Sequence, residues 1–367
     1  MLHDGVDRIV RAHGKFEQWR QSTGAAEAFD RDVWQQMADL GWLGLGIAEE
    51  YGGIGGTPTD IGIVMEGFGR GLLRQPYVSS CILSTHLLQA SGEALARALL
   101  EGIASGTTLV STAVAESHAR FHLQRVRTRA TRSEDGYTLT GEKSWVPDAS
   151  SADWFIVPAR TAGQDDAEDG ISLFLVPAAA PGLQRQDYRS PDHQHVGALR
   201  LAQVQLPASA LLGPCDAGLA LLEEAVDHAI VARLSEACGA MEAVAAMTLE
   251  YIKTRKQFGT TIGSFQSLQH RMVDMMVACE ESRSILGTAL QGLAGTPAQR
   301  RHAVSAAKTR IGQCGLYVGH QAVQLHGGIG TSDELAVSHY LKRLLMIDLA
   351  FGNSDHHLER FAATAAA

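Results

Sequence analysis

The stretch Tyr251–Met276, YIKTRKQFGTTIGSFQSLQHRMVDMM, decides how the chain is organised. A helical run ends in a cationic turn at Arg255, and cations suit the carbonyl end of a helix dipole. Gly259 tolerates backbone angles that other residues do not, so we expect a turn there and a second amphipathic helix from near Ser264. The Arg255 guanidinium and the Phe258 ring would then lie on the same exposed corner, where they could bind a phosphate or a dinucleotide. A charged helix end before a bundle turn is the plainer interpretation of the same residues.

This stretch resembles the helix–turn–helix in the C-terminal domain of the acyl-CoA dehydrogenase family. The residues that carry the resemblance are the run 255–259 (RKQFG), Ile262, and the pairs at 265–266 (FQ) and 269–270 (QH). The run 324–330, QLHGGIG, resembles the family's other C-terminal signature and follows the first at a suitable distance. Together with the architecture below, the resemblance covers nearly the whole chain.

Size and composition limit the possible functions. At 367 residues the chain can bury a large core and divide into two or three domains. A hydrophobic content of 45% with 19% charged residues is typical of a soluble globular protein. The net charge of -9 argues against binding to nucleic acid or to an anionic membrane surface. No apolar run reaches the roughly 18–20 residues that a membrane span needs.

The cysteines and histidines show no ligand pattern. Five cysteines, an odd number without CxxC spacing, predict reduced thiols in a cytoplasmic protein. None of the 15 histidines forms an HExxH motif or a similar frame, and the adjacent His356 and His357 would diverge on a helix. We therefore expect no metal site.

The hydrophobic period changes twice along the chain and predicts an α+β fold. Residues 1–106 have helical spacing, with a Gly-rich connector at 43–56. Residues 107–214 contain short β-type runs at 109–115, 137–140, 154–158, 171–176 and 199–206, which predict an antiparallel β domain. Helical spacing returns over residues 215–367, which we assign to a helical bundle. An N-terminal all-α domain, a middle β domain and a C-terminal four-helix bundle is also the architecture of the family that the chain resembles.

The resemblance implies FAD-dependent α,β-dehydrogenation of an acyl-CoA thioester. This reaction needs a carboxylate base, a flavin to accept the hydride, and hydrogen bonds that polarise the thioester carbonyl. In the family, a neighbouring subunit holds the ADP half of FAD. The positions that match are Arg255, Gln257, Phe258, Gln324, Gly327 and Gly328, and all are suitable.

The segments that hold the flavin within one subunit match less well. Trp145 matches the family's flavin-flanking Trp, but Pro147 replaces a flavin-bonding Thr and has neither a hydroxyl nor an N–H. Ala115 replaces a second flavin-facing Thr. The run 117–122, SHARFH, puts bulk and possible positive charge where small residues usually admit flavin and CoA.

The catalytic base is missing from both positions that the family uses. These positions correspond to Phe351 and to Ala232, and neither residue carries a carboxylate. Glu236, one turn beyond Ala232 on the same helix face, is a possible substitute, although an ordinary helix acid is the simpler interpretation. Asp348 and Asp355 flank Phe351 and are weaker candidates.

These gains and losses predict one subunit of a heteromeric acyl-CoA dehydrogenase, an α2β2 assembly in which a homologous partner supplies the base and the flavin cradle. The run 333–343 also resembles the pimeloyl-CoA dehydrogenase-like small-subunit branch, which suggests a lipid or steroid CoA ester and electron-transfer flavoprotein as acceptor. A self-sufficient homotetramer with an unorthodox base, a non-catalytic stabilising subunit, and a flavoprotein using oxygen chemistry stay open as alternatives.

Overall fold

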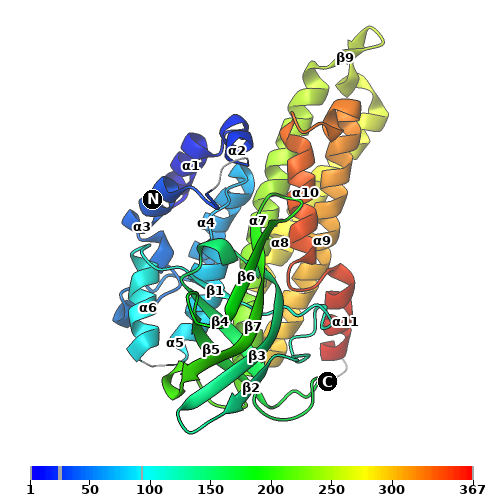
Figure 1. Ribbon diagram of the computed structural model, residues 1–367. Helices are drawn as coiled ribbons and strands as arrows, with labels where there is room; N and C mark the ends of the chain where they lie inside the picture. The colour runs from blue at the N-terminus through cyan, green and yellow to red at the C-terminus, as the bar shows by residue number, and fades with distance from the viewer. Residues whose placement is uncertain (1, 24–26, 92–93, 366–367) are drawn as a thin grey trace. The chain divides into compact units, whose positions relative to one another are not determined.

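The computed structural model of the chain describes residues 2–23, 27–91 and 94–365. Over this range the chain forms helices first, then strands, then long helices (Figure 1). The predicted α+β class, with helical, β and helical segments in that order, is confirmed.

The N-terminal segment forms short helices joined by tight turns. Asp30 starts α3 (Arg31–Asp39) by accepting hydrogen bonds from the backbone N–H groups of Asp32 at 3.0 Å and Val33 at 3.1 Å. Gly41, at a φ of +74°, follows the helix in the left-handed conformation with which helices commonly end. The remaining elements are α1 (Leu2–His13), α2 (Phe16–Ser22), the 3-10 helices η1 (Trp42–Gly44) and η2 (Glu49–Tyr51), α4 (Pro58–Gly71), the π-helix η3 (Tyr77–Ser84), α5 (Thr85–Gln89) and α6 (Ala94–Ala104).

The middle segment forms an eight-stranded sheet within the described residues. Its order is β6-β7-β3-β2-β4-β5-β8, with β1 beside β4. Most neighbours are antiparallel, as predicted, whereas β1 and β2 pair with β4 in parallel. The strands are β1 (Val110–Thr112), β2 (Arg129–Arg132), β3 (Gly136–Pro147), β4 (Trp154–Arg160), β5 (Ile171–Pro177), β6 (Leu183–Arg189), β7 (His195–Pro207) and β8 (Leu211–Leu212).

Strands β2, β6 and the two-residue β8 have no counterpart among the predicted strands. Strand β6 lies at the edge of the sheet, and every residue after Leu183 is exposed. Such a strand lacks the alternation of apolar and polar residues on which sequence prediction depends. The buried core of the sheet, which includes Leu139, Phe155 and Phe174, is supplied by strands that do show apolar runs.

The described part of the C-terminal segment contains three long α-helices followed by two shorter ones. They are α7 (Gly218–Thr254), α8 (Gln266–Gly292), α9 (Pro297–His326), α10 (Ala336–Leu349) and α11 (Ser354–Ala365). Helices α8, α10 and α11 pack against α9. Thr296 starts α9 with a capping box, in which the Gln299 side chain accepts a hydrogen bond from the Thr296 N–H at 3.0 Å. None of the helices in the described part of the chain has the length and apolarity to cross a membrane.

The chain folds as two compact units, each assembled from segments that are far apart in sequence. One unit comprises Met1–Gly24, Pro58–Leu73 and Ile230–Ala367, and the other comprises Ala25–Thr57 and Arg74–Ala229. The N-terminal helices are therefore divided between the two units. The sequence-based assignment to domains 1–106, 107–214 and 215–367 stays a prediction.

Within the first unit, α4 and α7 cross at very short range. A Cβ on Gly69 would lie 1.9 Å from the carbonyl oxygen of Glu236, and one on Gly239 would lie 2.0 Å from the carbonyl oxygen of Glu66. Any side chain at either position would therefore force the two backbones apart. This crossing fixes the stretch of α7 that carries Glu236.

Candidate functional site

The C-terminal end of α7 continues into a tight hairpin. Strands β9 (Lys256–Gln257) and β10 (Thr260–Thr261) pair in antiparallel fashion. Phe258 and Gly259 join them with φ angles of +55° and +79°, the backbone signature of a two-residue hairpin turn. The sequence predicts the break at Gly259 but not the hairpin, and α8 begins at Gln266, shortly after the predicted Ser264.

The loop after α9 lies beside this end of α7. Tyr251 stacks on His326 with ring centroids 4.2 Å apart, and its hydroxyl donates a hydrogen bond to the His326 carbonyl oxygen at 3.3 Å. Burial lowers the pKa of His326, which keeps this ring neutral at physiological pH. The Tyr251–His326 contact thus brings together the two sequence signatures, which are separated in the chain by helices α8 and α9.

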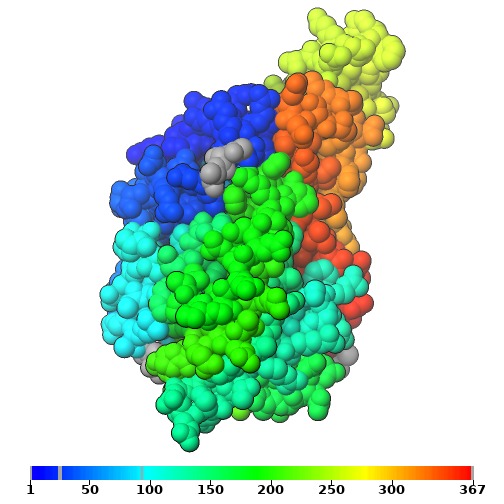
Figure 2. All heavy atoms as spheres, viewed as in Figure 1, coloured from blue at the N-terminus to red at the C-terminus, as the bar shows by residue number. Residues whose placement is uncertain are grey.

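Together these two turns form an exposed corner, which we call the hairpin corner. Its members are Arg255, Gln257, Phe258, Gln324, Gly327 and Gly328, and each is exposed. The Phe258 side chain is 92% exposed, and the hairpin stands clear of the neighbouring atoms in Figure 2. A Cβ on Gly327 or Gly328 would meet no atom within 4 Å, so both glycines border open space. The structure therefore brings the predicted ADP-binding residues to one end of the bundle.

Glu236 is enclosed between two arginines. Its side chain is 1% exposed, and it accepts hydrogen bonds from Arg233 Nη1 at 2.7 Å and from Arg343 Nε at 2.6 Å. Burial alone would raise the pKa of Glu236, but the charges of Arg343 and Arg233 and their hydrogen bonds hold it below its usual value. A carboxylate that stays ionised and is saturated by two guanidinium groups is a poor proton acceptor, so the geometry argues against Glu236 as a substitute base.

The other candidate positions for a base carry either no carboxylate or one that the fold already uses. Ala232 is buried on α7, and Phe351 follows α10 at a φ of +59°. The Asp348 carboxylate is buried and accepts hydrogen bonds from the backbone N–H of Ser354 at 3.2 Å and from its hydroxyl at 2.6 Å. Asp355 lies exposed in the first turn of α11, where an acid stabilises the helix.

In the other unit, Trp145 and Pro147 lie near the end of β3. The backbone N–H of Trp145 donates a hydrogen bond to the Tyr188 hydroxyl at 3.2 Å. The two rings meet edge to face with centroids 6.2 Å apart. The Pro147 carbonyl oxygen accepts from the Ser111 hydroxyl at 2.6 Å. Pro147 has no N–H to offer a ligand, and its carbonyl is already engaged by Ser111. The loss of a cofactor bond at this position stays a prediction.

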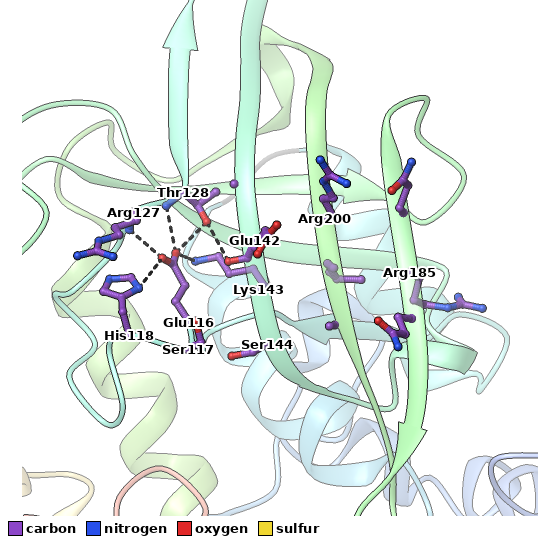
Figure 3. A pocket seen from close by; sticks show the side chains of 15 residues that line it. Glu116, Ser117, His118, Arg127, Thr128, Glu142, Lys143, Ser144, Arg185 and Arg200 are labelled. Carbon is purple, nitrogen blue, oxygen red and sulfur yellow. Dashed lines mark hydrogen bonds and ion pairs between the residues drawn. The ribbon is translucent and has the colours of Figure 1, made fainter.

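The same unit contains a pocket of about 660 Å³ that was not predicted from the sequence (Figure 3). Its wall combines the turn at 116–118 with residues 127–128, strand β3 at 141–144, β6 at 184–186 and β7 at 198–200. Because these segments are far apart in sequence, no motif marks the pocket.

A buried ion pair forms the floor of this pocket. Glu116 accepts hydrogen bonds from Lys143 Nζ at 2.7 Å, from the Thr128 hydroxyl at 2.8 Å and from the Arg127 backbone N–H at 2.8 Å. Burial would raise the pKa of Glu116, but the Lys143 charge and these hydrogen bonds lower it overall. Glu116 is therefore held as an anion, and it links its turn to residues 127–128 and to Lys143 on β3.

The pocket is lined by charges of both signs. Arg127, Arg185 and Arg200 come from three separate segments, and all three are exposed or half-buried. Arg127 is paired with Asp165 at 3.4 Å and Arg185 with Asp187 at 3.0 Å, and Glu142 also lines the pocket. His118 Nδ1 lies 3.8 Å from Glu116.

Comparisons with known families cover almost the whole chain. Family models for the N-terminal, middle and C-terminal domains of acyl-CoA dehydrogenases match residues 1–107, 111–203 and 216–366. Probable acyl-CoA dehydrogenase YngJ of Bacillus subtilis is 30% identical over 334 residues, which are 89% of this chain and 87% of that protein. Acyl-CoA dehydrogenase FadE27 of Mycobacterium tuberculosis is 27% identical over 363 residues, which are 97% of this chain and 93% of that protein.

Two solved structures of paired chains are similar to this fold. The ChsE4-ChsE5 complex from Mycobacterium tuberculosis has a TM-score of 0.90 and 27% identity, covering 100% of this chain and 96% of the matched chain. The Tcur3481-Tcur3483 steroid ACAD variant has a TM-score of 0.89 and 28% identity, with the same coverage. These likenesses confirm the predicted fold, and the family matches support FAD as the cofactor.

The described residues fit one half of FAD better than the other. The hairpin corner offers an exposed guanidinium at Arg255 and open backbone at Gly327 and Gly328, which suit a diphosphate. Near Trp145, which the family resemblance places beside the flavin, Pro147 can donate no hydrogen bond to a ring. The chain is thus better equipped for the ADP half than for the flavin.

Proposed function

Because the chain belongs to the acyl-CoA dehydrogenase family, we propose that it serves as one subunit of a heteromeric, FAD-dependent acyl-CoA dehydrogenase. In the proposed α2β2 heterotetramer, this chain gives its hairpin corner to the ADP half of an FAD. A homologous partner subunit holds the flavin of that FAD and supplies the catalytic base. The assembly would catalyse α,β-dehydrogenation of an acyl-CoA thioester.

One contrast carries this proposal. At the positions that the resemblance assigns to the base, the chain has Phe351 and the buried Ala232, and the nearby Glu236 is saturated by Arg233 and Arg343. The hairpin corner, in contrast, is exposed and open. This chain keeps the hairpin corner, which would bind a neighbour's FAD, and lacks a catalytic base of its own. Such a combination suits an active site that is shared between two subunits.

Within such a site, each retained group has a definite task. FAD, when bound, supplies the hydride acceptor. Arg255 would pair with the diphosphate through its planar donors, and the Gly327–Gly328 backbone would approach the nucleotide without steric conflict. Phe258, with its ring exposed, would cover an apolar face of the nucleotide. The proton abstraction belongs to the partner.

The descriptions of the two similar solved structures suggest a substrate class. One of them is described as a steroid ACAD and the other as a two-protein complex. The resemblance of residues 333–343 to a small-subunit branch points the same way. We therefore expect a bulky or ring-containing CoA ester from lipid or steroid catabolism, electron-transfer flavoprotein as the electron acceptor, and a cytoplasmic location consistent with five free cysteines.

The visible spectrum of the purified protein tests the shared site. The chain would be purified alone and, separately, co-expressed with a homologous chain encoded beside it. Flavin absorbance is expected in the co-purified complex alone. If the lone chain carries stoichiometric FAD that bleaches with an acyl-CoA, the protein is a self-sufficient enzyme and the proposal is wrong.

A substitution at Arg255 tests whether the hairpin corner binds FAD. Arg255→Ala should weaken FAD binding by the complex by about 10- to 100-fold, because a hydrogen bond to a charged group contributes about 1.5–3 kcal/mol. Lys253→Ala is the matched control, because Lys253 is an exposed cation of the same helix end that pairs with Glu250 at 3.0 Å. Unchanged FAD affinity in Arg255→Ala would instead favour a non-catalytic, stabilising subunit.

A further inference from the structure

Two histidines and a glutamate converge where α5 meets the N-terminal third of α7. Glu224 and His228 lie four residues apart on α7, so their side chains share one face of that helix. His86, on α5, lies against this face, and its Nε2 atom is 3.5 Å from Glu224 Oε1. All three residues belong to the same compact unit.

The spacing of these groups suits a common metal ion. One ligand atom from each residue can be chosen so that all three lie within 4.8 Å of one another. The rings of His86 and His228 have centroids 4.5 Å apart at an interplanar angle of 34°. Two imidazoles that bind one ion at about 2.1 Å have ring centroids about 4.5 Å apart at a right angle and about 5.2 Å apart at the tetrahedral angle, so a tetrahedral ion requires the two rings to separate by less than about 1 Å.

The backbone around the cluster is firmly held, whereas the cluster itself stays open to solvent. Leu87 and Leu88 on α5 are fully buried, as are Ala225 and Ala229 on α7. The side chains of His86 and Glu224 are 25% and 40% exposed, which leaves an entry path and room for water as a further ligand. A rigid frame with a partly open face is typical of three-residue sites that complete their coordination with water.

We propose that His86, Glu224 and His228 bind one divalent transition-metal ion of the Zn²⁺ class. Two imidazole nitrogens and one carboxylate oxygen form a donor set that such ions prefer over Mg²⁺ or Ca²⁺, which select oxygen ligands. The ion joins α5 to α7 and stabilises this unit. The sequence gives no sign of the site, because His86 lies far from the Glu-x-x-x-His pair and the three meet only in the fold.

Zinc titration of the full-length, untagged and chelator-treated protein tests the site. Isothermal titration calorimetry with ZnCl₂ should give one equivalent bound, and the midpoint of thermal unfolding should rise with saturating Zn²⁺. His86→Ala and His228→Ala should each weaken binding by at least about tenfold, because each removes one of three ligands. His320→Ala, which removes an exposed histidine elsewhere, should bind Zn²⁺ as the unaltered protein does.

Glu224→Gln keeps the experiment decisive if an alanine variant unfolds. This change preserves the size of the side chain and removes its charge, so the fold should persist while Zn²⁺ affinity falls. Circular dichroism in the absence of metal would confirm that each variant is folded. The proposal is overturned if Zn²⁺ does not bind saturably, or if the three variants and the His320→Ala control bind it equally, which would leave His86 and Glu224 as a simple ion pair.

Discussion

Helix α7 carries two arginine-centred regions of opposite character. Near its middle, Glu236 is buried and its carboxylate is shared by Arg233 and Arg343. At its C-terminal end, Arg255 and the Phe258 ring are exposed, and no carboxylate in the described part of the chain pairs with Arg255. The first region satisfies its charges internally, and the second leaves them available.

This difference separates residues that serve the fold from residues that serve another molecule. A buried charge without a partner is strongly unfavourable, so removing one member of the group around Glu236 should destabilise the fold. An exposed guanidinium beside an exposed ring adds little to stability. Substitutions around Glu236 should therefore cause large losses of stability, whereas substitutions around Arg255 should weaken cofactor binding and leave stability almost unchanged.

The largest effect is expected from Glu236→Ala. Removing this carboxylate leaves Arg233 and Arg343 without their shared anion, and breaking a buried pair costs about 3–5 kcal/mol. Urea denaturation would measure the fall in the free energy of unfolding. Glu250→Ala is the matched control on the same helix, because its exposed pair with Lys253 should contribute less than about 1 kcal/mol.

The same variant distinguishes a structural role from a catalytic one. If Glu236→Ala unfolds at the same urea concentration as the unaltered protein, while the assembled complex loses dehydrogenase activity, Glu236 serves chemistry. The comparison between the two regions would then fail, because the enclosed carboxylate would be part of the reaction.

An intermediate effect is expected from Lys308, and it should depend on pH. Lys308 is fully buried, and its Nζ donates hydrogen bonds to the backbone carbonyls of Ile347 and, at 2.9 Å, Asp348. Burial lowers the pKa of Lys308 to about 7. Above that pH the unfolded chain binds a proton that the folded chain does not, so the contribution of Lys308 to stability rises with pH.

Lys308→Met measures this contribution. Between pH 6.5 and about 8.5, the unaltered protein should gain about 1–2 kcal/mol relative to the variant, since one pH unit corresponds to at most about 1.4 kcal/mol for a single proton. Chemical denaturation at several pH values would give the two curves. Parallel curves for the two proteins would mean that Lys308 stays protonated in the fold, and that its two carbonyl contacts offset the burial.

The fold was largely predictable from the sequence, and the chemistry of individual side chains was not. Periodicity located the helical, β and helical segments, and the resemblance selected the residues of the hairpin corner, whose role stays a prediction. Arg233 lies three residues from Glu236 on the same helix, but the second partner, Arg343, lies 107 residues further along the chain and only packing brings it to Glu236. The pocket around Glu116 and the histidine cluster at His86 were not predicted for the same physical reason.

The smallest effect on stability is expected at Gly328, where the effect on cofactor binding should nevertheless be measurable. A Cβ at this position meets no atom of the chain, and its φ is not one that disfavours alanine. Gly328→Ala should therefore change the free energy of unfolding by less than about 1 kcal/mol, in either direction. If the backbone here approaches the ADP half of FAD, the added methyl group should weaken FAD binding by the assembled complex several-fold.

Gly287→Ala makes this last measurement specific. Gly287 lies in α8, and a Cβ there also meets no atom within 4 Å, so the two substitutions are sterically alike within the chain. Under the proposed function, a nucleotide lies beside Gly328 and not beside Gly287. Equal FAD affinities for the two variants, measured by fluorescence titration of the assembled complex, would place the nucleotide elsewhere and remove Gly328 from the hairpin corner's function. A loss confined to Gly328→Ala would show that the open space at the hairpin corner is occupied in the working complex, which is what distinguishes it from the saturated region around Glu236.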